Sequence, residues 1–363
     1  MSTGTLLLDT RSGGAALLKC QGGLSQTSGP FRRQTLKGLV RLLAYIIRRL
    51  INLIPLLLGI TVLSFIIINL APGDFLSEQR LNPEISQETL DTLEAQFGLD
   101  QPVYVQYFRW LGNVLRLDFG YSFAYKVPVF DLIGSRLLNT LLLTAVAMAI
   151  SWGLAIPIGI HAATHKYAWS DKVLTVFAFM GLSMPGFFLA LLVLYLIVAL
   201  QLPLPVGGMT SIDFDYMGFG EKAADLGKHL LIPALVLGTE GMAGIMRQMR
   251  GNLLDVLRLD YVTTARSKGL SERVVVYKHA VRNAINPLVT LLGFWLSSLI
   301  SGAALIEIMT SWPGLGRLML DALLAKDVYL VMGSLVMSSV LLVLGNLFAD
   351  IMLAVVDPRI RYN

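Results

Sequence analysis

Two carboxylates, Glu240 and Glu307, lie within or at the end of long apolar runs of this sequence. A carboxylate is costly in hydrocarbon and usually faces a water-filled cavity or a protein partner. Glu240 could therefore contact a transported solute or bond to a neighbouring helix, and the sequence leaves both interpretations open. Glu307 could contact solute as well, but it stands just before the Pro313, Gly314 and Gly316 turn, which favours a role in holding that turn.

Other reactive side chains do not form a recognisable catalytic or metal-binding pattern. A phosphate cradle needs a glycine-rich loop followed by Lys and a hydroxyl, but the Gly227-Lys228 pair is followed by His229. His161 and His165 have helical spacing without a third ligand, so we expect solvated interface residues and no metal site. No Ser, His and Asp grouping converges on one predicted side of a membrane, which argues against a hydrolase. We expect a protein that is not an enzyme and needs no cofactor.

The composition indicates that these residues are carried by membrane-spanning helices. Hydrophobic residues make up 55% of the 363-residue chain and charged residues 15%, whereas soluble domains carry about 25% charged residues. Apolar runs long enough to cross a bilayer recur along the chain, which predicts an all-α integral membrane protein. The third run is interrupted at Met184, Pro185 and Gly186, which predicts a kinked or broken helix there. The break could shape a pathway through the membrane or serve only the packing of the helices. We expect six transmembrane helices, at about 51–70, 137–160, 173–200, 230–246, 288–307 and 328–353.

The distribution of charge predicts which side each connection faces. Lys and Arg collect before the first span, in 161–172, in 247–286 and in the tail at 354–363, whereas acids dominate 72–136 and 201–228. Basic loops stay in the cytosol, so both termini should be cytosolic. The chain then divides into five parts: a disordered cytosolic N-terminal tail (1–35), a basic flank with the first span (36–71), an extracytoplasmic region (72–136), a transmembrane core (137–353) and a cytosolic C-terminal tail (354–363).

The cytosolic stretch 247–286 is too patterned for a plain basic loop. Asp255–Arg266 is predicted to be one helix, and Gly269 would end it because glycine accepts the positive φ of a helix end. Ser271 is a good N-cap for a second helix with a partly apolar face at Val274, Val275 and Val281. We predict a helix-turn-helix coupling loop between spans 4 and 5 that a partner could push or pull.

This stretch resembles the EAA loop of permeases from ATP-binding-cassette importers, in the variant of the dipeptide, oligopeptide and nickel group. The resemblance extends over roughly 40–361 and includes the turn EIMTSWPGLGRLMLDAL, with Trp312 in its centre, and the ending DPRIR. Thr263 and Thr264 depart from the general signature but fit this variant. The matching positions are Asp260, Tyr261, Val262, Thr264, Ala265, Arg266, Lys268, Gly269, Leu270, His279, Ala280, Arg282, Asn283, Ala284 and Pro287.

Such a resemblance implies a division of labour among several chains. A second homologous permease completes the pathway, cytosolic ATPase subunits drive it, and an extracytoplasmic solute-binding protein delivers peptides or similar small solutes. It also implies a multi-pass protein of the bacterial plasma (inner) membrane, with no nucleic-acid partner. Within the loop, Ala265 is expected at the contact with the ATPase, flanked by Arg266 and Lys268.

Two other functional classes compete with this interpretation. A stand-alone ion-coupled secondary transporter should have inverted repeats and several paired charges near the bilayer midplane. No repeat is evident, and Glu240 is nearly alone in its run. An integral-membrane enzyme would need a catalytic constellation, which the sequence does not provide.

Overall fold

The computed structural model describes residues 101–356 continuously, together with 47–48, 51–52, 54–67, 69–70, 80, 86–88, 90 and 92. The described residues belong to one compact unit, residues 46–363. The predicted tail at 1–35 and the last seven residues lie outside the described part of the chain. So does most of 86–97, where Ser86 and Gly98 as helix-end residues predict an amphipathic helix.

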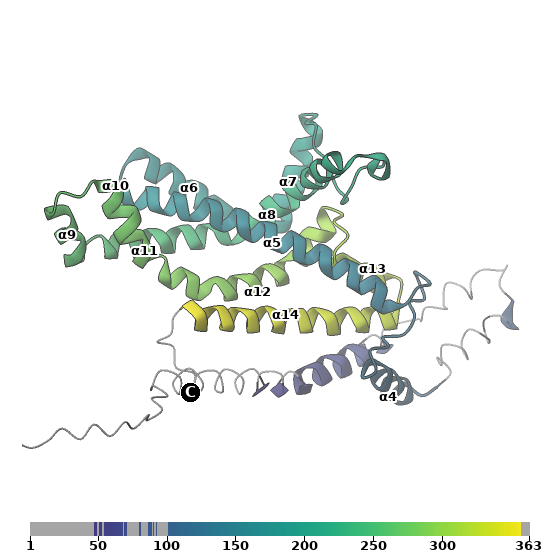
Figure 1. The fold of residues 1–363 in the computed structure, drawn as a ribbon. Helices are drawn as coiled ribbons and strands as arrows, with labels where there is room; N and C mark the ends of the chain where they lie inside the picture. Colours follow the sequence, from purple (N-terminus) through teal and green to yellow (C-terminus); the bar gives the residue numbers. More distant parts are fainter. Residues whose placement is uncertain are drawn as a thin grey trace, which may run out of the picture. The chain divides into compact units, whose positions relative to one another are not determined.

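Throughout the described residues the regular elements are helical, and no strand is found beyond an isolated bridge between Tyr121 and Pro128. Figure 1 shows the order along the chain. The α-helices are α4 (Val103–Val114), α5 (Val129–Thr164), α6 (Trp169–Ser183), α7 (Gly186–Ala199), α8 (Phe219–Val256), α9 (Asp260–Ser267), α10 (Glu272–Val274), α11 (Val281–Ala284), α12 (Asn286–Met309), α13 (Leu315–Leu324) and α14 (Val328–Val356); η1 (Phe214–Tyr216) and η2 (Val275–Ala280) are a 3₁₀ and a π turn.

Within the described residues, three helices are long and apolar enough to cross a membrane. They are α5, α8 and the Val328–Leu347 part of α14. Shorter apolar helices occupy Ile54–Ile67, α7 and the Ser298–Met309 part of α12. The predicted spans at 137–160, 230–246 and 328–353 overlap the three long helices, and the other three overlap the shorter ones. The all-helical membrane class is confirmed for the described residues, and the count of six spans stays a prediction. The ends differ from the prediction, because α8 begins eleven residues before the expected span at 230 and continues ten residues past 246.

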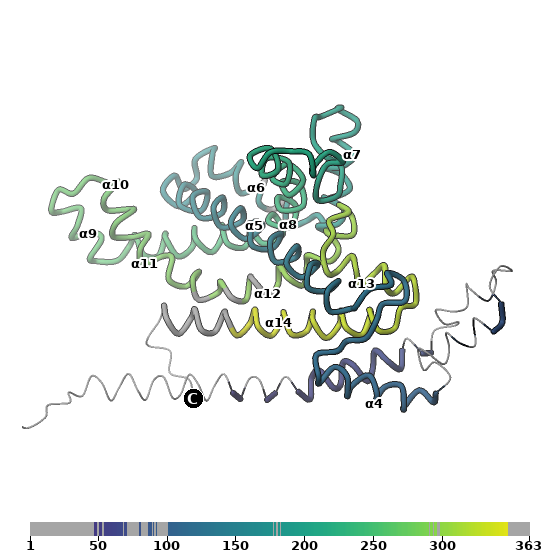
Figure 2. The backbone as a smooth tube through the Cα atoms, turned by 45° about the vertical axis from the view of Figure 1, so that its right-hand side comes forward, coloured from purple at the N-terminus to yellow at the C-terminus, as the bar shows by residue number. Residues whose placement is uncertain are grey.

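Small residues let α5 and α8 pack closely along much of their length (Figure 2). A Cβ on Gly238 of α8 would lie 2.9 Å from the carbonyl oxygen of Ala147, and a Cβ on Gly159 of α5 would lie 2.8 Å from that of Met246. Neither contact could accommodate a side chain. Gly238 and Gly159 therefore permit the close approach of the two helices.

Three apolar clusters follow one another along α5. Val129 and Ile133 pack with Trp110, Leu330 and other residues of α4, α13 and α14. Leu143 and Ala147, further along, pack with residues of α7, α8 and α12. Residues 155–163 of α5 pack with the end of α8 and with α9, η2 and α11. The segment 260–284 and the α13 segment therefore lie at opposite ends of α5 (Figures 1 and 2).

Two helix boundaries test predictions from the sequence, and one prediction is wrong while the other is confirmed. Asp255–Arg266 is not one helix, because α8 ends at Val256 and α9 begins at Asp260, with Leu259 extended between them at ψ 148°. This turn brings Val262 into the apolar cluster at the end of α8. The third apolar run is divided as its Pro-Gly pair predicts: Met184 and Pro185 are extended and separate α6 from α7.

Candidate functional site

The segment 260–284 folds as two helical stretches joined at a glycine. Gly269 has φ +76°, a backbone conformation that favours glycine, and a Cβ there would meet open space. The break predicted at this residue is confirmed. Ser271 occupies the N-cap position of α10, but its side chain makes no capping hydrogen bond. Gly269 therefore sets the angle between the two stretches through its backbone alone.

An apolar seam joins these two stretches to the ends of α8 and α5. Ala265 and Val262 of α9 are 7% and 0% exposed, and they belong to one cluster with Val275 and Ala280. In this chain the Ala265 side chain packs against its own segment, and the ATPase contact expected of it stays a prediction. Its small size serves close packing of α9 on η2.

The outer surface of the segment is polar and exposed. Arg266 forms a bidentate pair with Glu272 at 2.7 and 3.2 Å, which lowers the pKa of Glu272. Arg266 is thus already paired within the chain. Lys268 and Arg282 are exposed as well.

A polar cluster links the two helical stretches on the same side. The Asn283 amide donates to the Tyr261 hydroxyl at 2.8 Å, and both side chains lie within 3.4 Å of the His279 carbonyl oxygen. Asn252 of α8 donates to the Ala284 carbonyl at 3.1 Å. Motion of the segment is thereby coupled to α8, because hydrogen bonds and packing both connect them.

At the opposite end, Glu307 and α5 hold the turn between α12 and α13. Glu307 is fully buried; it accepts from the Thr140 hydroxyl at 2.5 Å and from the Gly316 N–H at 2.8 Å. A Cβ on Gly314 would overlap the Glu307 carboxylate. The side-chain amide of Asn139 donates to the Pro313 backbone carbonyl at 2.8 Å, and the backbone carbonyl of Asn139 accepts from the Trp312 indole N–H at 3.1 Å. The arrangement encloses the carboxylate, so no solute reaches Glu307 in this structure.

Glu240 has the opposite environment. It lies near the middle of α8, its side chain is exposed, and among the described residues it has no hydrogen-bond or ion-pair partner. A Cβ on Gly186, the first residue of α7, would overlap its carboxylate, and one on Gly302 of α12 would lie 3.1 Å from Oε2. The break at Pro185 and two glycines therefore leave space for this side chain.

A buried ion pair between α6 and α8 was missed by the sequence reasoning. Asp171 is 4% exposed and accepts from Arg250 at 2.9 and 3.1 Å and from the Tyr167 N–H at 3.0 Å. The hydrogen bonds from Arg250 lower the pKa of this carboxyl, against the effect of burial. The signal was a lone acid in the basic connection 161–172.

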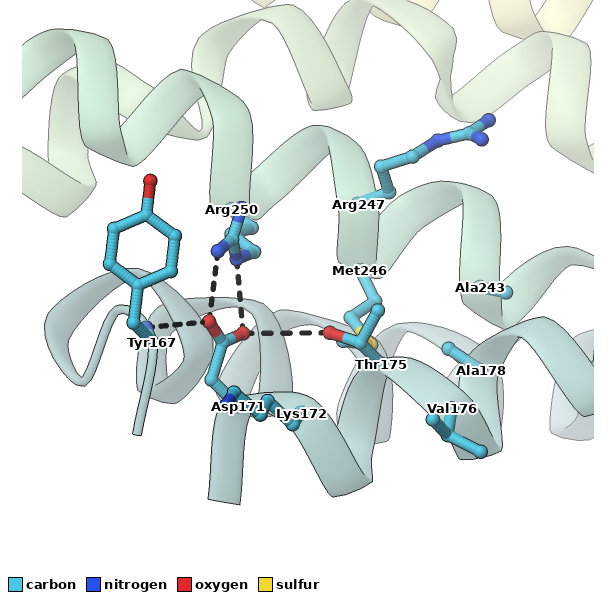
Figure 3. A pocket seen from close by; sticks show the side chains of 10 residues that line it. All are labelled: Tyr167, Asp171, Lys172, Thr175, Val176, Ala178, Ala243, Met246, Arg247 and Arg250. Atoms are coloured by element: carbon cyan, nitrogen blue, oxygen red, sulfur yellow. Dashed lines mark hydrogen bonds and ion pairs between the residues drawn. The ribbon is translucent and has the colours of Figure 1, made fainter. Parts of the chain in front are cut away.

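The ion pair borders a cavity of about 590 Å³ between α6 and α8 (Figure 3). Ala243, Met246 and Val176 give it apolar walls, and Arg247 and Lys172 bring positive charge. In Figure 3 the Arg247 guanidinium points away from Asp171. A polar solute with negative charge could be held here.

A second buried carboxylate, Asp327, was also not predicted. It accepts from the Ser122 hydroxyl at 2.7 Å and the Ala124 N–H at 3.0 Å, and from the Leu330 N–H at 3.1 Å. It therefore caps the start of α14 and ties it to the loop before α5. An acid immediately before an apolar helical run was the available signal. Among the described residues no group of three His, Cys, Asp or Glu could hold a metal.

Comparison with known proteins decides the family. Residues 155–362 match the family described as binding-protein-dependent transport system inner membrane component, and residues 42–144 match its N-terminal region. The first match spans more than half of the chain. This chain belongs to that family. It is a permease subunit of an ATP-binding-cassette importer, as the resemblance of the stretch 247–286 predicts, and is a transport component and not itself an enzyme.

Three relatives align over nearly the whole chain. The chain is 43% identical over 321 residues to the oligopeptide transport system permease protein AppB of Bacillus subtilis, covering 88% of this chain and 99% of that protein. It is 36% identical over 326 residues to the glutathione transport system permease protein GsiC of Salmonella typhimurium (89% and 100% covered). It is 35% identical over 338 residues to the dipeptide transport system permease protein DppB of Escherichia coli (89% and 100% covered). Membership in this binding-protein-dependent family sets aside the stand-alone secondary transporter.

Proposed function

We propose that this permease forms, with a second homologous permease, the pathway by which peptides enter a bacterial cell across the plasma membrane. Cytosolic ATPase subunits hydrolyse ATP, and an extracytoplasmic binding protein delivers the solute. Oligopeptide, dipeptide and glutathione permeases among the relatives support a peptide-like solute. Ile54–Ile67, α5, the α6–α7 pair, α8, α12 and α14 are the six spans, with both termini cytosolic.

Residues 260–284 are the surface that receives force from the ATPase. The observation that supports this assignment is how the segment is held: an apolar seam and the Asn252 hydrogen bond connect it to α8, and the Tyr261–Asn283–His279 cluster joins its two helical stretches. A solvated basic loop whose Lys and Arg served only to keep it in the cytosol would need none of these contacts. Asp260, Lys268, Arg282 and the exposed side of Tyr261 face the ATPase, whereas Ala265 and Gly269 shape the fold that presents them.

The intramembrane candidates divide between two roles. Glu240, beside the helix break at Pro185, belongs to the pathway. Glu307 with Trp312, Pro313, Gly314 and Gly316 fixes the outer turn. The topology places this turn outside, so it also shapes the mouth through which the binding protein delivers solute.

Substitution of Gly269 tests the coupling assignment. Gly269→Asp puts a charged side chain on an exposed residue with positive φ, at a cost of roughly 1–2 kcal/mol. We expect the permease to insert and to assemble with its partner permease, but ATPase binding and peptide uptake should fall together. Pull-down of the ATPase, membrane level and uptake should be measured side by side.

Gly208 provides a matched control for this substitution. It also has positive φ, +81°, with open space around its Cβ position, but it lies in the 201–218 connection at the other end of α8. Gly208→Asp should retain the ATPase. If Gly269→Asp binds the ATPase and transports as well as Gly208→Asp, the coupling assignment is wrong.

The orientation can be tested with single cysteines after Cys20, the only native one, is replaced by Ser. Cysteines at Thr210 and at Gln96, which lies outside the described residues, should react with an impermeant thiol reagent added to intact cells. A cysteine at Lys268 should react only after permeabilisation. The reverse pattern would refute the proposed topology.

A further inference from the structure

The face of α8 that carries Glu240 also carries a second uncompensated charge. Between residues 232 and 250 the only two exposed side chains are Glu240 and Arg247. Neither has a hydrogen-bond or ion-pair partner among the described residues. Residues 232–250 of α8 therefore expose one anionic and one cationic side chain, and all their other side chains are buried or partly buried.

The spacing of the two charges places them on one side of the helix without letting them neutralise each other. Seven residues are almost two full turns, so the side chains project in nearly the same direction and stand about 10.5 Å apart along the axis. Ion pairs within a helix form at a separation of three or four residues. Each charge is thus presented outward to a different counter-charge.

The neighbouring elements keep this face open. Gly186 and Gly302 lack the side chains that would collide with Glu240, and the extended residues Met184 and Pro185 separate α6 from α7 beside it. The cavity between α6 and α8 reaches Ala243 and Arg247, one and two turns further along α8. The open space beside Glu240, the cavity and the two charged side chains therefore lie along the same side of α8.

Lipid is an unfavourable neighbour for such a face. A carboxylate exposed to the centre of a bilayer costs about 2.5 kcal/mol or more, and Arg247 stands at the cytosolic end of the expected span 230–246. The face must meet water or protein, which in a two-permease pathway means the pathway itself or the partner permease.

We propose that Glu240 and Arg247 bind the two termini of a zwitterionic peptide, Glu240 the α-ammonium and Arg247 the terminal carboxylate. An extended dipeptide spans about 7 Å, and a charge-assisted hydrogen bond adds about 2.8 Å at each end. The total of about 13 Å is close to the separation of the two residues along α8, about 10.5 Å, because both side chains are long enough to adjust. This inference rests on the proposed function, because it names the solute group that each charge receives.

A crossed substrate analysis tests the assignment in the complete importer with its binding protein. Uptake of a dipeptide is compared with uptake of its des-amino analogue and of its C-terminal amide, in the wild type, Glu240→Gln and Arg247→Gln. Discrimination by the binding protein is the same for every permease variant and cancels in the ratios. Lys228→Gln, an exposed cation near the start of α8, controls for loss of charge.

We expect Glu240→Gln to reduce the preference for the free amine about tenfold, the factor given by 1.4 kcal/mol of coupling. Its preference for the free carboxylate should stay as in the wild type, and Arg247→Gln should show the converse. Lys228→Gln should change neither ratio. Equal loss of all three substrates in both variants would overturn the proposal, since it would indicate charges that only hold the partner permease.

Thiol labelling provides a second measurement that does not depend on uptake. In the assembled importer lacking Cys20, Glu240→Cys and Arg247→Cys should react with a small charged thiol reagent, and saturating dipeptide should slow that reaction. Absence of reaction at both positions would overturn the proposal. A wild-type importer that takes up no peptide would instead refute the proposed function, while labelling would still report whether this face is open to water.

Discussion

Glu307 and Glu240 are the same residue type in two helices that contact each other, α12 and α8, yet their surroundings are opposite. Glu307 is enclosed by α5 and the α12–α13 turn and has hydrogen-bond partners on both oxygens. Glu240 is exposed, without a described partner, and is bordered by two glycines. A buried polar group that is fully satisfied stabilises one arrangement of helices, whereas one left open is available for binding.

The comparison extends to two other acids of the described structure. Asp171 pairs with Arg250 at the boundary of α6 and α8, partly shielded from water. Glu272 pairs with Arg266 on the exposed segment 260–284. We expect the contribution of each of these four carboxylates to the free energy of unfolding to increase with its burial and its pairing. Mutation of each carboxylate tests that order.

Loss of Glu307 should have the largest effect on stability. Glu307→Ala leaves the Thr140 hydroxyl and the Gly316 N–H without an acceptor, and each unsatisfied buried donor costs about 1–3 kcal/mol. We expect a loss of about 3 kcal/mol, measured by thermal unfolding of the purified transporter. Glu307→Gln, which keeps one acceptor oxygen, should lose less; equal losses would show that the turn does not depend on these hydrogen bonds.

Breaking the Asp171–Arg250 pair should have the next largest effect. Asp171→Asn leaves Arg250 without its counter-charge; because the Arg250 side chain is 27% exposed, we expect about 2 kcal/mol, less than for a fully buried pair. The same unfolding measurement at neutral pH checks this value. Arg250→Gln should cost a similar amount, and a change within error in both variants would contradict the assignment.

The same pair predicts a pH dependence of stability. Because Arg250 lowers the pKa of Asp171 below its unfolded value of about 3.9, the pair stabilises fully above that pH. Its contribution is lost as the pH falls through the lower folded pKa. The stability difference between the wild type and Asp171→Asn should therefore shrink below about pH 4. A difference that stays constant down to pH 3 would exclude this linkage.

The exposed pair should matter little to stability. The side chains of Arg266 and Glu272 are 43% and 62% exposed, and pairs of this kind contribute about 0.2–1 kcal/mol before screening by salt. We expect Arg266→Ala to change the unfolding free energy by at most about 0.5 kcal/mol, and less in high salt. A larger loss would show that the pair, and not only the apolar seam, holds α9 against α10.

Glu240→Gln should have the smallest effect on folding. The side chain has no described partner to lose and Gln has nearly the same shape, so the unfolding midpoint should stay at the wild-type value. Marked destabilisation would remove the contrast with Glu307 and indicate a structural partner. Gly186→Ala sharpens the test, because the added Cβ would overlap the Glu240 carboxylate and should destabilise the protein. Combining it with Glu240→Ala removes that carboxylate, so the double variant should recover the lost stability.

The sequence by itself determined the class of protein, the apolar helices and the local breaks. Apolar length is a property of the chain, so α5, α8 and α14 were predictable from composition and run length. Gly269 and the Met184–Pro185–Gly186 interruption were predictable because glycine and proline act on their own backbone. The helix at Asp255–Arg266 was mispredicted for the complementary reason: the turn at Leu257–Leu259 contains no such residue and forms because Val262 packs against the end of α8.

Only the tertiary structure decided which charged and small residues face inward. Ala265 looks like a contact residue in sequence, but α9 packs its small side chain against η2. Asp171 and Arg250 are 79 residues apart, and nothing in local spacing links them. Glu240 and Glu307 both read as carboxylates in apolar runs; their difference arises from α5 covering one of them while glycines of α7 and α12 leave the other open. Packing between distant segments sets that difference, and no local pattern encodes it.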